Sequence, residues 1–364
     1  MIKVFYFYYN KNKYYSSTPI VNNFKMLFEN KNFFLENNIE VTPFIDFVEK
    51  FDKNKLLTDD PKTSLDPNFE SAMLEILSHL PELSQKYEKI IFLGFHPKPF
   101  TPIHRHYKTL KKYPNIYTAL WQDDLQAYFH PENRIKKFDL VDRIITPSPI
   151  YFKNVAPHLL DKTSFFFYSI DFKYIKGCAQ KFSRRKKKIL LSGCINPNYR
   201  IRSEINQEIL TNSKFAKIAD VLHKPKMKEY NYANKKILPY GINYYKILGS
   251  YFGAFFAYYD APMNFNLAKI IEILSVGCIG FFEESPLLQE ELGLIPYVHY
   301  VPCTQNGELI IKTKFYKYFL NNVDGVGQKI AAQGKKYIED NFSNKNELKN
   351  YIKIFNDIGK NEKK

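Results

Sequence analysis

Lys269 and Glu272 place a cation and a carboxylate three residues apart within one amphipathic segment. Leucine and isoleucine recur at helical spacing through residues 267–274, so the two charged side chains project from neighbouring positions on one helix. Gly277 tolerates a positive φ and is expected to end this helix. An apolar run at residues 278–282 follows at once and predicts a buried strand.

A helix that leads directly into a strand is half of a βαβ unit. Ligands of such sheets bind at one edge, near loops and helix N-termini. Lys269 and Glu272 can therefore face a ligand there, or they can form a surface ion pair worth about 0.2–0.5 kcal/mol. From residue type and spacing alone, the surface pair is the simpler interpretation.

Candidate proton acceptors lie in the N-terminal half of the chain. Asp123 and Asp124 follow the apolar strand predicted at residues 116–121, and His130 is the nearest imidazole after them. His96 lies in the loop that follows another apolar run. A carboxylate or an imidazole can act as a general base towards a hydroxyl. An aspartate pair at the end of a strand can equally be a helix cap.

The histidines and cysteines do not predict a metal site. The four cysteines and eight histidines show no ligand-type spacing, so we expect no metal and no cofactor. Cys194 and Cys278 fall in strand or strand-edge contexts, which indicates buried free thiols in a reducing compartment. No signal peptide is visible, and the longest aromatic-rich run, residues 251–259, is too short to span a bilayer. These features predict a cytoplasmic protein.

The composition describes a globular and strongly basic chain. Its 364 residues are enough for two domains, and 45% hydrophobic with 25% charged residues excludes a disordered protein. A net charge of +16 favours anionic partners, which include nucleotide phosphates, a membrane surface and nucleic acid. The charge is spread along the chain apart from one dense run at residues 184–188. That run is best interpreted as a solvated approach to a strand, with a phosphate or membrane role as the alternative.

Strand and helix patterns alternate along both halves of the sequence. This alternation predicts parallel, doubly wound sheets. We expect a polar linker between the halves and a cleft that suits a large anionic ligand and a second substrate. The expected strands are at residues 2–9, 41–47, 89–94, 116–121, 143–146, 165–168, 188–192, 253–258, 278–282 and 297–301; the expected helices are at residues 22–36, 69–87, 201–210, 244–251, 327–342 and 345–358.

Three segments of the C-terminal half together resemble the donor-binding domain of glycosyltransferases of the GT-B fold, as in the group 1 glycosyl transferases. Residues 188–202 (KILLSGCINPNYRIR) resemble the strand, glycine loop and helix entry that open that domain. Residues 269–278 (KIIEILSVGC) resemble its Lys-x-x-Glu-x-x-x-x-Gly segment, and residues 329–342 resemble its closing helix. The resemblance is weaker over the N-terminal half, where residues 119–125 and 142–148 carry it.

The resemblance implies a domain organisation as well as an activity. It implies an α/β protein with two doubly wound, Rossmann-like domains facing a cleft. We expect an acceptor-side domain at residues 1–175, a linker at 176–187, a nucleotide-sugar-binding domain at 188–343, and a C-terminal helix with a charged tail at 344–364.

The same resemblance gives the candidate residues roles towards a nucleotide sugar. It implies that Glu272 accepts hydrogen bonds from ribose hydroxyls and that Lys269 reaches the pyrophosphate. Gly193 would let the backbone approach the phosphates. Arg200 and Arg202 follow at the helix entry, and Arg202 better matches the family's arginine. For the arginines a solvated helix N-terminus is the alternative, and for Gly193 a simple turn.

One departure concerns the stereochemical course of the reaction. Retaining members with two glutamates eight positions apart would carry the first at residue 264, where this chain has Asn264. Asparagine can bond a sugar hydroxyl but carries no charge, so retention and inversion both stay open. In an inverting enzyme, Asp123, Asp124, His130 or His96 would take the proton of the acceptor hydroxyl.

We therefore predict a metal-independent glycosyltransferase that moves a sugar from a nucleotide diphosphate sugar to a hydroxyl of a glycan or lipid-linked acceptor. Such an acceptor is compatible with peripheral association at the inner face of the membrane. A nucleotide-sugar epimerase of the same fold is the alternative enzyme. A basic, non-catalytic nucleic-acid-binding protein is the alternative from another class, although no segment resembles a nucleic-acid module, so no nucleic-acid partner is expected.

Overall fold

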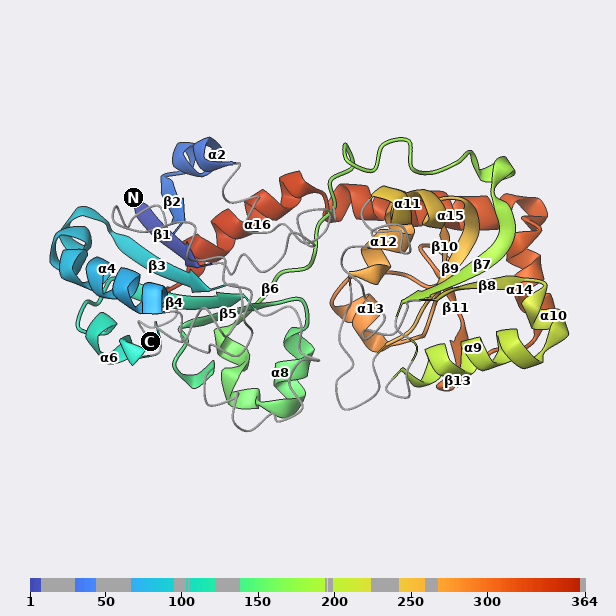
Figure 1. Cartoon of the computed structure of the whole chain (residues 1–364), viewed down its shortest axis with the longest axis horizontal. Helices are drawn as coiled ribbons and strands as arrows, with labels where there is room; N and C mark the ends of the chain where they lie inside the picture. Colours follow the sequence, from blue (N-terminus) through green and yellow to red (C-terminus); the bar gives the residue numbers. More distant parts are fainter. Residues whose placement is uncertain are drawn as a thin grey trace. The chain divides into compact units, whose positions relative to one another are not determined.

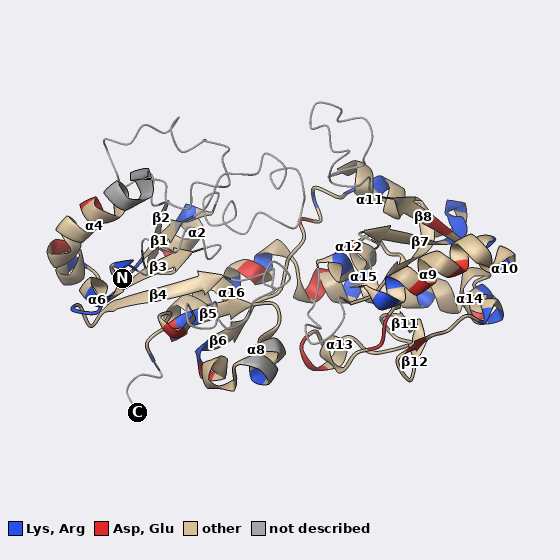
Figure 2. Cartoon of the chain, turned by 60° about the horizontal axis from the view of Figure 1, so that its bottom comes forward, with Lys and Arg blue, Asp and Glu red and all other residues tan. Residues whose placement is uncertain are grey.

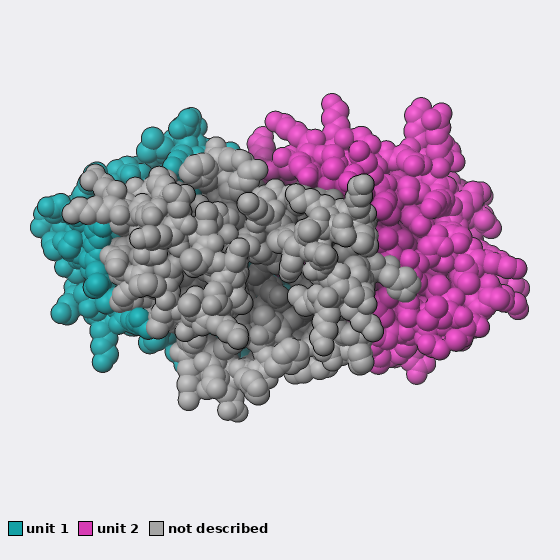
Figure 3. Space-filling model, in the orientation of Figure 1, with its two compact units in different colours: residues 1–16, 21–167, 347–364 teal, residues 17–20, 168–346 magenta. Residues whose placement is uncertain are grey.

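The computed structural model divides into two compact units. One holds the described residues up to 167 together with those from 347 onward, and the other holds residues 168–346 (Figure 3). The residues that the structure describes are 1–7, 30–43, 67–94, 103, 105–121, 138–193, 195, 199–223, 242–258 and 268–360.

The first unit is built on a six-stranded parallel sheet with the order β2-β1-β3-β4-β5-β6 (Figure 1). Its inner strands are almost wholly buried, as expected of a parallel sheet covered on both faces, and residues 90–93 of β3 are all apolar. The strands are β1 (Ile2–Phe7), β2 (Ile39–Pro43), β3 (Lys89–Gly94), β4 (Ile116–Trp121), β5 (Arg143–Thr146) and β6 (Thr163–Phe165). The helices are α2 (Lys31–Glu36), α4 (Pro67–Lys86), α6 (Tyr107–Leu110), α8 (Pro149–Val155) and the 3-10 helix η3 (Pro157–Lys162).

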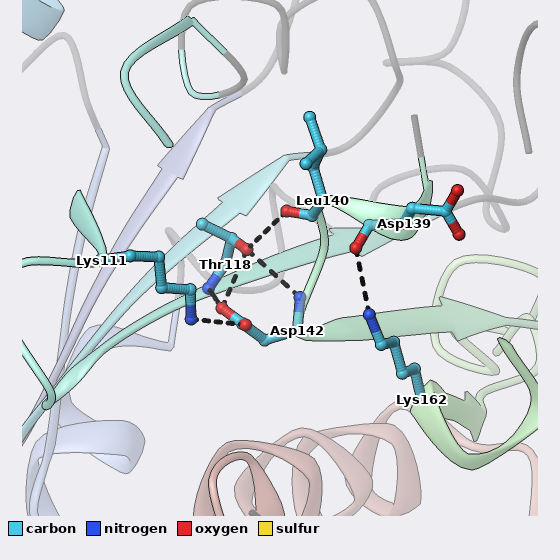
Figure 4. A network of polar contacts seen from close by, with 6 residues as sticks. All are labelled: Lys111, Thr118, Asp139, Leu140, Asp142 and Lys162. Atoms are coloured by element: carbon cyan, nitrogen blue, oxygen red, sulfur yellow. Dashed lines mark hydrogen bonds and ion pairs between the residues drawn. The ribbon is translucent and has the colours of Figure 1, made fainter. Parts of the chain in front are cut away.

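A buried carboxylate joins β4 to the segment that enters β5 (Figure 4). Asp142 Oδ1 lies 2.5 Å from the Lys111 ammonium, and Asp142 Oδ2 accepts hydrogen bonds from the backbone N–H and the hydroxyl of Thr118 at 2.7 and 3.0 Å. The Asp142 N–H is directed at Thr118 Oγ1 at 3.2 Å. Asp142 precedes its strand, so this network fastens the amino ends of β4 and β5. It is structural, because ligands of such sheets bind at the carboxyl ends.

The last helix, α16 (Asn344–Asp357), packs in the core of the first unit from residue 347 onward. The Tyr351 ring lies 4.6 Å from the Phe166 ring, and the Phe355 ring lies 6.2 Å from that of Phe34. The Lys89 ammonium donates to the carbonyls of Phe355, Asn356 and Ile358 at 2.5–3.1 Å, so a cation caps the negative end of the helix. The sequence pattern predicted the helix but not this packing.

The second unit has a five-stranded parallel sheet with the order β11-β10-β9-β7-β8. The chain winds outward from β7 in both directions, so the carboxyl end of β7 is the topological switch point where doubly wound sheets bind ligands. The strands are β7 (Lys186–Gly193), β8 (Ala219–His223), β9 (Tyr251–Phe256), β10 (Ile279–Phe282) and β11 (Val301–Pro302), and β12 (Thr304–Gln305) forms a hairpin with β13 (Glu308–Leu309). The helices are α9 (Arg200–Thr211), α10 (Ser213–Ala216), α11 (Ile242–Leu248), α12 (Lys269–Ser275), α13 (Pro286–Glu290), α14 (Thr313–Leu320) and α15 (Val326–Asn341), with 3-10 turns η4 (Phe182–Arg184) and η6 (Val323–Gly325).

Aromatic side chains fill the core of the second unit. The rings of Phe255, Phe281 and Tyr316 lie 5.4–5.9 Å apart, and all three side chains are buried. Phe182 adds a further ring against Phe252 at 4.3 Å. Edge-to-face and tilted pairs of this kind contribute beyond their buried area. In the described core, the high aromatic content of the chain therefore serves packing.

Charged side chains are distributed over both units. In the view of Figure 2, lysine and arginine colour helices of each unit, for example α9, α15 and α16. Within the dense basic run, Arg185 is structural, because its guanidinium donates to the carbonyls of Gly277 and Val276 at 2.5 and 2.9 Å, beyond the end of α12. Among the described residues, no helix combines the length and apolar character that crossing a bilayer requires.

Most of the predicted elements agree with the structure, and two strands do not. The expected strands at 89–94, 116–121 and 143–146 match the bounds of β3, β4 and β5. The expected strand at 165–168 is wrong beyond its first residue, since β6 ends at Phe165. The expected strand at 297–301 is wrong except at its last residue, because Tyr297 adopts a φ of +59° and the chain turns there. The α/β class with parallel sheets is confirmed.

Candidate functional site

A chain of polar side chains links three elements at the carboxyl edge of the second sheet. Ser192 lies near the end of β7, Tyr244 lies on α11, and Lys269 and Glu272 occupy the first turn of α12. The hydroxyl oxygens of Ser192 and Tyr244 are 2.9 Å apart, and Lys269 Nζ donates to the Tyr244 hydroxyl at 2.7 Å. Lys269 Nζ also lies 2.5 Å from Glu272 Oε2. The three contacts link the Lys269–Glu272 pair to the carboxyl end of β7.

Lys269 and Glu272 do not form the exposed surface pair that residue type and spacing alone favoured. The side chains are only 19% and 16% exposed. Burial lowers the pKa of Lys269, but the Glu272 carboxylate and the Tyr244 hydroxyl outweigh burial and raise the pKa above its usual value. The ammonium also lies 4.2 Å from the centre of the Tyr244 ring, a cation–π distance. Lys269 is therefore a fixed cation at physiological pH.

The ammonium keeps hydrogen-bonding capacity for a ligand. A lysine ammonium has three N–H donors; one is donated to the Tyr244 hydroxyl, and the ammonium forms an ion pair with Glu272 at 2.5 Å. In the described part of the chain, no further protein acceptor contacts Lys269 Nζ. A remaining N–H can thus be donated to an anion, while the Glu272 carboxylate can accept hydrogen bonds from hydroxyl groups.

Gly193 and Arg202 form the second feature of this edge. Gly193 has a φ of +113°, a backbone conformation that side-chain-bearing residues rarely adopt. The Arg202 side chain packs behind it, with only 4% of the residue exposed. Its guanidinium lies 4.0 Å from the centre of the Tyr199 ring and donates to the Ala257 carbonyl at 2.9 Å. Arg202 thereby joins the start of α9 to the end of β9 and supports the glycine loop.

Arg200 has a different environment from Arg202. It is exposed at the start of α9 and pairs with Glu204 at 2.9 Å. It also donates to the Gly307 carbonyl, in the turn of the β12–β13 hairpin, at 2.7 Å. These contacts fix the hairpin to α9, and a role of Arg200 towards a donor phosphate stays a prediction.

The remaining predicted residues lie outside the described residues. These are the candidate bases Asp123, Asp124, His130 and His96, and Asn264 before α12. Their roles stay predictions. Within the described ranges, no group of three histidine, cysteine or acidic residues has the geometry of a metal site.

Sequence reasoning missed Tyr244 and Ser192. Tyr244 was placed in an expected helix, and Ser192 in an expected strand, but neither carried a signal of its own. The contact between them joins residues 52 positions apart, and the contact of Tyr244 with Lys269 spans 25 positions. The order of strands and helices in the folded sheet brings these side chains together. No pattern of neighbouring residues in the sequence could have predicted these contacts.

Comparisons with known proteins identify the fold. No family model and no curated protein matches the sequence. Among solved structures, a glycosyltransferase from Rickettsia africae has 13% identity and a TM-score of 0.55, with 99% of each chain covered. Anabaena Alr3699/HepE, in complex with UDP and glucose, has 10% identity and a TM-score of 0.60, covering 98% of this chain and 100% of its own. An alpha-glucosyltransferase in complex with UDP-glucose and DNA containing an abasic site has 12% identity and a TM-score of 0.54, covering 98% and 99%.

These likenesses extend over essentially the whole chain, at identities where only the backbone arrangement is informative. The chain has the GT-B fold of glycosyltransferases, as the sequence resemblance predicted.

Proposed function

We propose that this protein is a glycosyltransferase that moves a sugar from a nucleotide diphosphate sugar to a hydroxyl of a glycan or lipid-linked acceptor. The observation that carries the proposal is the position of the largely buried Lys269–Glu272 pair. A chain of side-chain contacts through Tyr244 to Ser192 links it to the carboxyl end of β7. A cation can bind a pyrophosphate, and a carboxylate can accept hydrogen bonds from the hydroxyls of the ribose joined to it. Both groups are linked in this way to the end of β7, where Gly193 lies.

In this proposal each described residue has a distinct task. The Glu272 carboxylate accepts hydrogen bonds from the ribose hydroxyls, since a charged acceptor makes stronger bonds than a neutral one. The Lys269 ammonium contacts the pyrophosphate and offsets the negative charge that grows on it as the nucleotide leaves. Gly193, with its positive φ and no side chain, lets the phosphates approach the backbone. The Arg202 guanidinium packs against Gly193 and supports its backbone.

The donor proposed for the first tests is a UDP-sugar. Anabaena Alr3699/HepE was solved with UDP and glucose, and the alpha-glucosyltransferase with UDP-glucose. These ligands support a UDP-sugar here only through the shared fold, so GDP-sugars belong in the same panel. The acceptor's proton would pass to one of the predicted bases, Asp123, Asp124, His130 or His96.

The test is binding of nucleotide sugars followed by analysis of the product. A true donor should raise the thermal unfolding temperature of the protein in proportion to the logarithm of its concentration, because it binds the folded state alone. Glu272→Ala and Lys269→Ala should each reduce this shift without unfolding the protein. If both variants bind nucleotide as the wild type does, the assignment of the site is wrong.

Incubation of the bound donor then separates the enzyme classes. A transferase releases nucleotide diphosphate and, with acceptor, a glycoside that NMR detects. An epimerase instead converts the donor sugar with no acceptor present. A protein that binds no nucleotide sugar, but retains nucleic acid on a filter with a steep salt dependence, would contradict the proposal.

A further inference from the structure

Tyr244 lies between the two halves of the proposed donor site. Its hydroxyl is 2.7 Å from Lys269 Nζ on α12 and 2.9 Å from Ser192 Oγ at the end of β7. The Lys269 ammonium also lies 4.2 Å from the centre of the Tyr244 ring. One side chain thus contacts both the proposed phosphate-binding cation and the strand that leads into the glycine loop.

The hydrogen-bond directions in this chain follow from the chemistry of the groups. An ammonium only donates, so the Tyr244 oxygen accepts from Lys269. Burial raises the pKa of Tyr244, so its hydroxyl keeps its proton at physiological pH. Among the described residues, Ser192 Oγ is the one acceptor within reach of that proton. When Tyr244 donates to Ser192, the hydrogen of Ser192 is directed away from Tyr244.

A lysine side chain has four rotatable bonds and loses much conformational freedom when it is fixed. Glu272 alone would hold the ammonium over its own helix, one turn along α12. Tyr244 contacts the same ammonium from α11, so two contacts on separate helices define its position. The ammonium is therefore held in position before any ligand binds.

We infer that Tyr244 is a positioning residue that orients the Lys269 ammonium towards the diphosphate of a nucleoside diphosphate, and that Tyr244 is itself anchored through Ser192 to the carboxyl end of β7. The inference rests on the proposed function and extends it to a residue that carries no sequence signal. Tyr244 acts through Lys269 and need not touch the ligand itself.

The variant Tyr244→Phe isolates this role, because it keeps the ring and removes only the hydroxyl. The matched control is Tyr245→Phe on the same helix. The Tyr244 side chain is half-buried and that of Tyr245 is buried, but the Tyr245 hydroxyl has no hydrogen-bond partner in the described structure. The two variants therefore make the same chemical change one residue apart, and only one of them alters a contact with Lys269.

Calorimetric titration with UDP and with uridine tests the inference, and GDP with guanosine serves as the parallel pair. Tyr244→Phe should weaken binding of the diphosphate about tenfold, the usual effect of losing a hydrogen bond to a charged group. The nucleoside, which has no phosphates, should bind as it does to the wild type. In a Lys269→Met background, Tyr244→Phe should have no further effect, and Tyr245→Phe should change neither ligand. A merely structural role would weaken nucleoside and diphosphate alike.

The remaining outcomes distinguish the two proposals. If the wild type binds a diphosphate and Tyr244→Phe binds it equally well, the positioning role is overturned and the proposed function stands. The role is also overturned if the tenfold loss persists in the Lys269→Met background, because it then does not act through Lys269. If the wild type binds neither UDP nor GDP, the proposed function and the role of Tyr244 fail together.

Discussion

Gly193 and Arg202 are packed so closely that any side chain at residue 193 would meet the guanidinium. A Cβ atom built on Gly193 would lie 3.1 Å from Arg202 Nη1, closer than most Cβ contacts in proteins. Arg202 cannot move away without cost, because it also lies against the Tyr199 ring and donates to the Ala257 carbonyl. The backbone at Gly193, at the end of β7, therefore depends on both the conformational freedom of glycine and a fixed arginine.

The variant Gly193→Ala tests this packing. We expect it to lower the free energy of unfolding by about 1–3 kcal/mol, because alanine is strained at a φ of +113° and crowds Arg202. Urea unfolding measures the loss. Gly177→Ala is the control, since Gly177 also has a positive φ (+79°) but no atom within 4 Å of the added Cβ. If the two variants lose the same free energy of unfolding, contact with Arg202 does not contribute to the effect of Gly193→Ala.

The contrast between local and long-range features explains how much the sequence could predict. The strands β3, β4 and β5 were predicted because apolar and β-branched residues cluster in each, and Lys269 and Glu272 because helical spacing places them together. The burial of that pair was not predictable, since it depends on Tyr244 from another helix. In the N-terminal half, the predicted proton acceptors are Asp123, Asp124, His130 and His96. They lie outside the described residues, so their roles stay predictions.

Arg185, within the basic run at residues 184–188, also makes contacts that the sequence could not predict. Residues 184–188 gave a uniform charge pattern, which favoured a solvated approach to a strand. In the structure Arg184 is exposed and fits that interpretation, whereas Arg185 is directed at the carbonyls of Val276 and Gly277. The partner carbonyls are 91 and 92 residues away, so no pattern within the run could distinguish the two arginines.

Arg185→Met should therefore destabilise the protein, and Arg184→Met should not. Arg185 satisfies two backbone carbonyls just beyond the carboxyl end of α12, where a cation is also favoured by the helix dipole. Its loss should cost about 1.5–3 kcal/mol, typical of hydrogen bonds to a charged group. Arg184→Met should stay within about 0.5 kcal/mol of the wild type. Urea unfolding of both variants measures the difference. Similar free energies of unfolding for the two would contradict the role of Arg185 in capping α12.

Cys278 should resist alkylation in the folded protein. Its side chain is fully buried, and Sγ is directed at the carbonyls of Leu248 and Tyr251 at 3.2 and 3.5 Å. Burial raises the pKa of the Cys278 thiol to about 12, although nearby Arg185 acts in the opposite direction. We expect peptide mapping after N-ethylmaleimide treatment at pH 8 to find Cys278 modified in urea but not in buffer, because the thiolate is the reactive form.

The raised pKa of Cys278 also predicts how the stability of the protein changes with pH. A group whose pKa is higher in the folded state binds more protons there, so its contribution is complete below the pKa of the unfolded chain. For Cys278 that contribution should be lost as the pH rises from about 9 towards about 12. Stability measured across this range should fall less in Cys278→Ala than in the wild type. A parallel decline in the two proteins would contradict the assignment.

The last prediction concerns Lys89, which joins β3 to the final helix of the chain. Its ammonium donates to the carbonyls of Phe355, Asn356 and Ile358, which no intrahelical N–H can satisfy at the carboxyl end of α16. Lys89→Met keeps the length of the side chain but removes the donors, and we expect it to lower the free energy of unfolding by about 1.5–3 kcal/mol.

Protease sensitivity shows where that loss occurs. Because the cap fixes α16 to the first unit, Lys89→Met should increase cleavage within residues 344–360 under native conditions, as expected of an element that opens locally. Lys112→Met, which removes an exposed lysine of the same unit, is the matched control and should resemble the wild type. If Lys89→Met is destabilised but cleaved no faster within α16, the lysine stabilises β3 rather than the helix.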